Sequence, residues 1–84
     1  MAEMDRVETE VRGAIARAFR LSPEDAAGPL AMGYPVAWDS LGHMQLVMEI
    51  ERTFGIRFPT PVIAGLRDVR AIVEAVKTRQ SAGR

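Results

Sequence analysis

An all-α fold, a small helical bundle, is predicted for this 84-residue chain by three observations. Apolar residues recur with helical spacing in three segments, these segments are bounded by residues that begin or end helices, and no segment alternates apolar and polar residues as a strand does. The stretch of residues 21–38 carries three prolines and two glycines, which predicts a long loop. The sequence therefore predicts the order helix, long loop, helix, short helix, helix, packed around one core.

The first predicted helix covers residues 3–20. Its apolar face repeats every four residues, at Val7, Val11, Ile15 and Phe19. Acids and arginines occupy the other faces, which we interpret as solvent-exposed. Apolar residues are interspersed in the loop that follows, so we expect this loop to pack over the helices rather than to form a free linker.

The second helix is expected to begin at Asp39 or Ser40, because both residue types are good N-caps, and to end before Gly55. Its predicted apolar stripe consists of Leu41, Met44, Val47, Met48 and Phe54, widened by Leu46 and Ile50.

The short helix is predicted from an N-cap at Thr60 to about Ala64. Asp68 is expected to cap the last helix, whose apolar positions are Val69, Ile72, Val73 and Val76. We predict a single domain over residues 1–84, with an ordered core over about residues 5–79 and a tail that frays from Gln80.

Composition excludes several classes of function. The chain has no cysteine and one histidine, His43, which leaves little for a metal cluster or a catalytic triad. Eleven basic and eleven acidic residues cancel, so the electrostatic footprint of a nucleic-acid binder is missing. No apolar run approaches the roughly 20 residues of a membrane span, and residues 1–10 do not resemble a signal peptide. We therefore expect a cytoplasmic, monomeric protein, and the initial Met1 favours a free-standing one.

The most informative segment is Trp38-Asp39-Ser40-Leu41-Gly42. A serine at the start of a helix lies beside unpaired backbone N–H groups and the positive end of the helix dipole, where a phosphate is favoured by about 0.3–1 kcal/mol. The alternative interpretation is that Asp39 and Ser40 serve only as the helix cap.

Asp39-Ser40-Leu41, the apolar helix after it and Phe54-Gly55-Ile56 together resemble the acyl carrier protein and peptidyl carrier protein family. The resemblance extends from about Val7 to Val76. It implies a four-helix bundle of the acyl-carrier-protein type, with three longer helices, one short helix and a long loop between helices I and II.

The resemblance also implies a function. Ser40 would be the covalent attachment site of phosphopantetheine, delivered from coenzyme A by a phosphopantetheinyl transferase. The protein would be a carrier rather than an enzyme, holding acyl, aminoacyl or hydroxyacyl groups as thioesters. Its partners would include an acyl- or aminoacyl-loading enzyme and a downstream synthase, transferase or thioesterase. Asp39 and Leu41 would flank the attachment site and assist recognition.

Other residues keep two interpretations. By analogy with the family, Met44, Met48 and Ile56 line the surface that docks partner enzymes, and burial in the core is the alternative for each. We expect His43 to be exposed. Trp38 is expected to pack in the core, with shielding of the arm as the alternative.

The second helix is poor in acids compared with fatty-acid carriers. Gly42, Gln45, Arg52 and Arg57 occupy positions where that type commonly has acids. This difference favours a carrier in polyketide, nonribosomal-peptide or related biosynthesis, with primary fatty-acid synthesis as the alternative. An alternative of another class is a helical protein-interaction module without a prosthetic group. A small hydrolase that uses Ser40 would need a base and an oxyanion hole, and His43 is the one available base.

Overall fold

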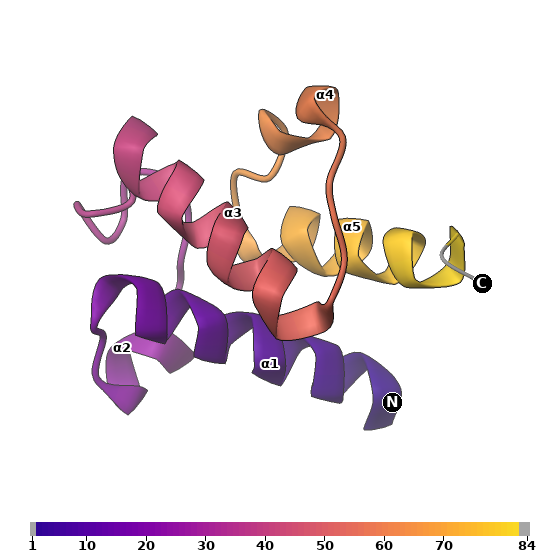
Figure 1. Cartoon of the computed structure of the whole chain (residues 1–84). Helices are drawn as coiled ribbons and strands as arrows, with labels where there is room; N and C mark the ends of the chain where they lie inside the picture. Colours follow the sequence, from indigo (N-terminus) through magenta and orange to yellow (C-terminus); the bar gives the residue numbers. More distant parts are fainter. Residues whose placement is uncertain (1, 83–84) are drawn as a thin grey trace.

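The computed structural model describes the backbone of residues 2–82 and the side chains of residues 6–81. In this part of the chain the elements are α1 (Ala2–Phe19), α2 (Pro23–Ala27), α3 (Ser40–Phe54), α4 (Thr60–Ile63) and α5 (Val69–Ala82). α1 packs against α2, α3 and α5, and α3 lies across the bundle so that its first turn is at the end remote from the end of α5 (Figure 1). The all-α prediction, with three longer helices, is confirmed.

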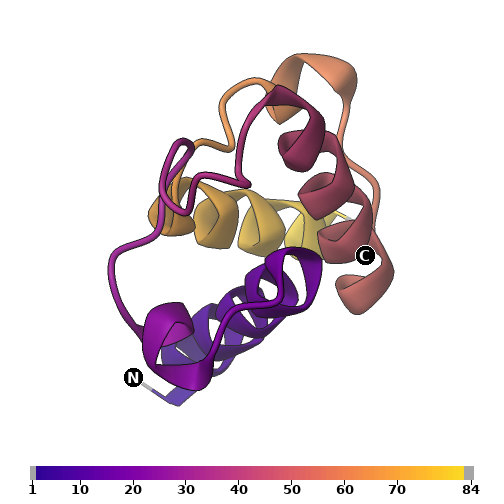
Figure 2. The same ribbon diagram turned by 90° about the vertical axis from the view of Figure 1, so that its left-hand side faces the viewer.

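The core lies where α1, α3 and α5 face one another, and the loop before α3 and the α4 region close over it (Figure 2). The largest side chains that are fully buried are Trp38, Ile15, Leu46, Ile50, Ile72, Val11 and Val76. Trp38 is 0% exposed, so its expected place in the core is confirmed. Burying each aliphatic or aromatic side chain contributes about 1.5–3 kcal/mol, which is the main source of stability in a chain without disulfides.

The structure differs from the sequence-based expectation inside the long loop, where α2 adds one extra helical turn. Ser22 is the N-cap of α2, its side-chain oxygen accepts a hydrogen bond from the Asp25 N–H at 3.1 Å, and Pro23 is the first helical residue. A serine N-cap followed by proline is a helix-start signal, and the density of prolines and glycines around it concealed that signal.

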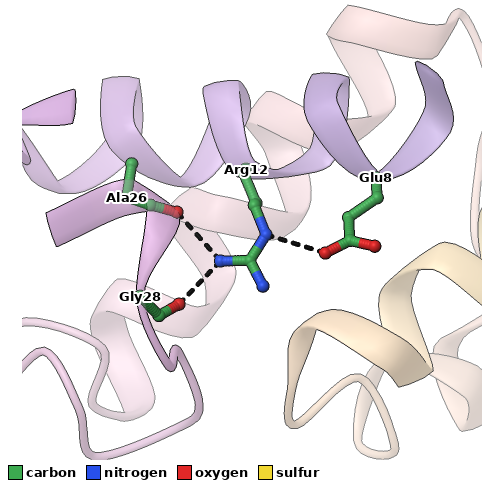
Figure 3. A network of polar contacts seen from close by, with 4 residues as sticks. All are labelled: Glu8, Arg12, Ala26 and Gly28. Carbon is green, nitrogen blue, oxygen red and sulfur yellow. Dashed lines mark hydrogen bonds and ion pairs between the residues drawn. The ribbon is translucent and has the colours of Figure 1, made fainter. Parts of the chain in front are cut away.

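Arg12 holds α2 against α1. Its Nη1 donates to the carbonyl oxygens of Ala26 at 2.9 Å and Gly28 at 2.6 Å, and its Nε donates to Glu8 Oε2 at 2.9 Å (Figure 3). The guanidinium thereby satisfies carbonyls at the C-terminal end of α2, where a cation is favoured. The sequence indicated that the charged faces of this helix are exposed to solvent. Arg12, on one of these faces, instead joins α2 to α1.

The rest of the loop is fixed by backbone hydrogen bonds. Met32 N–H donates to the Arg67 carbonyl at 2.8 Å, which joins the loop to the segment before α5, and Gly33 N–H donates to the Trp38 carbonyl at 2.8 Å. The expectation that the loop packs over the helices is confirmed for its buried or partly buried apolar residues, but not for Tyr34 and Val36, which are 66% and 85% exposed. These bonds fix the approach of the chain to the first turn of α3.

Smaller differences concern helix ends. The N-cap of α4 is Pro59, so Thr60 is already helical, one residue earlier than expected. Asp68 Oδ1 accepts a hydrogen bond from the Ala71 N–H at 2.8 Å, as expected of a cap for α5. α5 continues past Gln80 to Ala82, and residues 83–84 of the expected tail lie outside the described residues.

Among the residues that the structure describes, no helix has the length and apolar character needed to cross a bilayer.

Candidate functional site

The first turn of α3 is held by a side-chain cap. Asp39 has extended backbone angles, and its Oδ1 accepts a hydrogen bond from the Gly42 N–H at 2.8 Å, while its carbonyl accepts from the His43 N–H at 2.7 Å. An Asp N-cap satisfies one of the orphan N–H groups at a helix start and is worth about 0.5–2 kcal/mol. Asp39 is therefore the cap, and Ser40 is the first residue of the helix.

The inner side of this turn has no space for a side chain at position 42. A Cβ built on Gly42 would overlap the carbonyl oxygen of Ala37 and would lie 3.0 Å from Cε1 of Phe19. The glycine thus lets the loop backbone lie directly on the helix, in a position that any larger residue would push apart. The loop and the helix start are therefore in direct backbone contact at this point.

His43 is buried, with 6% of its surface exposed, so the expectation that it is exposed was wrong. Trp38 Nε1–H donates to His43 Nδ1 at 2.9 Å, and His43 Nε2 is 2.8 Å from the carbonyl oxygen of Ile63. Because the indole nitrogen is only a donor, Nδ1 must accept, and the ring proton is assigned to Nε2, which donates to Ile63. The two ring planes are nearly parallel, at 12°, and their centroids are 6.2 Å apart, as expected for rings joined edge to edge by this hydrogen bond.

This arrangement ties three segments together: the end of the loop through Trp38, α3 through His43 and the end of α4 through Ile63. The sequence contained a signal for it, because position 43 precedes the buried residues Leu46, Val47 and Ile50 by three, four and seven positions. That is the spacing of one helix face.

The outer side of the same turn is open. Ser40 is exposed, and within residues 6–81 its hydroxyl has no protein hydrogen-bond partner. Leu41 is 71% exposed and Met44 is 45% exposed. With about 100° between successive residues, Met44 lies about 40° from Ser40 around the helix axis and Gly42 about 160° from it, so Ser40 and Met44 share a face and Gly42 lies on the opposite side. His43 lies about 60° from Ser40 on the flank that turns toward the core, where it is buried. The inner contacts therefore fix the orientation in which α3 presents the serine.

The predicted apolar stripe of this helix combined two faces. Leu46, Val47 and Ile50 are buried, whereas Leu41, Met44 and Met48 are exposed, with Met48 at 58%. His43 lies on the same buried face of α3 as these residues, and Trp38 of the loop packs against it. The exposed residues leave an apolar surface that begins next to Ser40.

A shallow groove of about 540 Å³ lies at the other end of α3, lined by Met48, Glu51, Arg52, Gly55, Ile56 and Arg57. Ile56 is partly buried and packs against the core, as the alternative interpretation predicted, and it also borders this groove. A role of Ile56 in docking stays a prediction. We call this feature the α3 groove. It lies at least eight residues, or about 12 Å along the helix, from Ser40.

The surroundings of Ser40 provide no catalytic machinery from this chain. Both ring nitrogens of His43 are engaged on the inner side of the helix, and the Asp39 carboxylate is bonded to the helix backbone. Within the described residues no group of three or more His, Cys, Asp or Glu side chains could hold a metal. The His43 imidazole is therefore not available as a base toward the Ser40 hydroxyl in this arrangement.

The site nevertheless fits a phosphoester on Ser40. The hydroxyl is exposed on the first turn of a 15-residue helix, and that turn contains no acidic residue of its own. The positive end of the helix dipole favours the phosphoester anion. Leu41 and Met44 provide apolar surface beside it for the uncharged part of a longer substituent.

Comparison with protein-family models supports this chemistry. The model of the phosphopantetheine attachment site family matches residues 9–76, which is most of the chain. Comparison with curated proteins and with solved structures gave no match. The matched range includes α3 and the complete set of inner contacts that position Ser40.

Proposed function

Because the chain belongs to the phosphopantetheine attachment site family, whose members are non-catalytic carriers, we propose that Ser40 is the residue to which phosphopantetheine is attached. The observation that supports this assignment is the exposed hydroxyl at the first turn of α3, held outward by the Asp39 cap and by the close approach of Gly42 to the loop. When bound, phosphopantetheine supplies a thiol that holds an acyl group as a thioester. This chain has no cysteine of its own to do so.

In this proposal the chain's residues have separate tasks. Asp39 and Gly42 orient the helix start, and the serine oxygen becomes the ester oxygen when a phosphopantetheinyl transferase uses coenzyme A. Leu41 and Met44 provide exposed apolar contacts for the transferase and for the loading and downstream enzymes. Met48 and Ile56 extend that docking surface toward the α3 groove.

The assignment is tested by intact mass after incubation with coenzyme A and a promiscuous phosphopantetheinyl transferase. The wild type is expected to gain the mass of one phosphopantetheine, and Ser40→Ala is expected to gain nothing. Ser22→Ala is the matched control, since Ser22 is also an exposed serine at a helix start. Modification of Ser40→Ala, or its loss in Ser22→Ala, would refute the assignment.

The pathway is a finer proposal. We propose that the carrier serves polyketide, nonribosomal-peptide or related biosynthesis, with acyl, aminoacyl or hydroxyacyl cargo. The supporting observation is that both acids in the second half of α3 are engaged by the chain itself. Glu49 Oε2 accepts from Arg17 Nε at 2.8 Å, and Glu51 Oε2 accepts from the Phe58 N–H at 2.9 Å. Few carboxylates remain to attract a basic partner.

Primary fatty-acid synthesis is the competing pathway. It predicts that the modified protein accepts a malonyl group from a fatty-acid-synthase malonyl transferase as efficiently as an acidic carrier does. Our proposal predicts much slower transfer and a weak dependence on salt. Equal rates for the two carriers would favour fatty-acid synthesis.

A further inference from the structure

We propose that the α3 groove is a docking site for an acidic protein surface that presents an apolar side chain between its carboxylates. The proposal rests on the carrier function and adds the charge of the partner that this particular chain accepts. It follows from which charged side chains around the groove have partners within the chain and which are exposed.

The acidic side chains near the groove already interact with other groups of the chain. Glu49 is only 17% exposed and is shared by Arg17 at 2.8 Å and Arg52 at 3.4 Å. Glu51 is half-buried, and one of its oxygens caps the Phe58 N–H. Glu49 is thereby neutralised by two arginines, and Glu51, which lines the groove, has one of its two carboxylate oxygens engaged.

The cations, in contrast, face solvent. The Arg52 side chain is 73% exposed and makes only the longer of the two contacts to Glu49, and Arg57 is exposed and has no ion pair within the described residues. Both line the groove, whose apolar surface is formed by Met48 and Ile56. The groove is thus lined by two apolar side chains, two arginines and one acid, Glu51.

The positive character continues on the neighbouring surface. Gly55 and Ile56 also border a second depression, which is lined by Arg6, Lys77 and Arg79 and by one described acid, Glu10. Nε of Arg79 is buried there without a hydrogen-bond partner in the part of the chain that the structure describes. Since the accessible cations are Arg52 and Arg57, a complementary surface would carry carboxylates opposite them, and an apolar residue between the carboxylates would cover Met48.

The experiment uses two synthetic amphipathic helical peptides with the same leucine face, one with glutamates and one with lysines on the polar face. Each is titrated into the protein, with and without phosphopantetheine, and binding is located by NMR shifts. We expect the acidic peptide to bind about threefold to tenfold more tightly, because two partly exposed charge pairs form, and to shift Met48, Gly55 and Ile56. Raising the salt concentration should reduce the preference.

The double variant Arg52→Glu with Arg57→Glu is expected to reverse the preference. The control Arg20→Glu with Arg70→Glu changes the net charge equally at exposed positions outside the groove and should leave it unchanged. Equal affinity for the two peptides, or shifts that lie elsewhere, would overturn the proposal. So would binding of anionic vesicles or self-association through these residues in place of peptide binding. Intact mass reports Ser40 loading independently, so failure of the carrier function would be seen separately.

Discussion

Replacing His43 with phenylalanine tests whether the inner contacts of the α3 start hold the structure as described. The change removes the acceptor for Trp38 Nε1–H, which is buried, and the donor to the Ile63 carbonyl, which is partly buried. Phenylalanine keeps an aromatic ring in place, so the loss of hydrogen bonds is the main effect.

The expected magnitude follows from these two groups. A buried donor left without a partner costs about 1–3 kcal/mol, and the second bond, which is partly buried, is worth about 0.5–1.5 kcal/mol. The free energy of unfolding should therefore fall by about 1.5–4.5 kcal/mol. A chain of 84 residues has roughly 4–13 kcal/mol in total, so the loss is a large fraction of its stability.

Urea unfolding followed by circular dichroism measures this loss. With an m-value near about 1.5 kcal/mol/M, the midpoint should move down by about 1–3 M. His43→Gln keeps an acceptor and a donor and should recover part of the stability.

A double-mutant cycle identifies the cause. In a Trp38→Phe background no indole donor is left unpaired, so His43→Phe should cost at least about 1 kcal/mol less than in the wild type. A free energy of unfolding that stays within about 0.5 kcal/mol of the wild type, or an equal cost in both backgrounds, would refute the reasoning.

Three further predictions concern the elements that position Ser40. Gly42→Ala should lower stability by about 1–3 kcal/mol in thermal unfolding because its Cβ overlaps the Ala37 carbonyl, although alanine favours helix; a stabilised variant would contradict this. Arg12→Met should cost about 1–2 kcal/mol and speed hydrogen exchange in α2, with Arg12→Lys intermediate; unchanged exchange would show that α2 does not depend on the guanidinium. Asp39→Ala should cost about 0.5–2 kcal/mol and Asp39→Asn much less, by urea unfolding; equal losses would argue against a capping role.

The sequence was sufficient to predict the parts of the fold that depend on local chemistry. Asp39 begins α3, Gly55 ends it in the left-handed region at φ 64°, and Asp68 caps α5, because caps and glycine C′ positions act through neighbouring backbone groups. The exposed serine at the helix start follows from the same local signals.

The residues that the sequence placed wrongly or missed depend on tertiary partners. His43 belongs to the core face only because Trp38 and Ile63, five and twenty positions away, meet its two nitrogens. A polar residue at a core position is expected to be exposed unless its hydrogen-bond partners are known. Arg12 bonds to carbonyls 14 and 16 residues away, which helical periodicity does not reveal.

The most direct test of the central claim is to locate the modification within the chain. After transfer from coenzyme A, tryptic digestion yields the segment of residues 21–52, which contains both Ser22 and Ser40. Fragmentation by tandem mass spectrometry is predicted to place one phosphopantetheine on fragments that contain Ser40 and lack Ser22. A segment that stays unmodified, or one that carries the added mass on Ser22, would contradict the account.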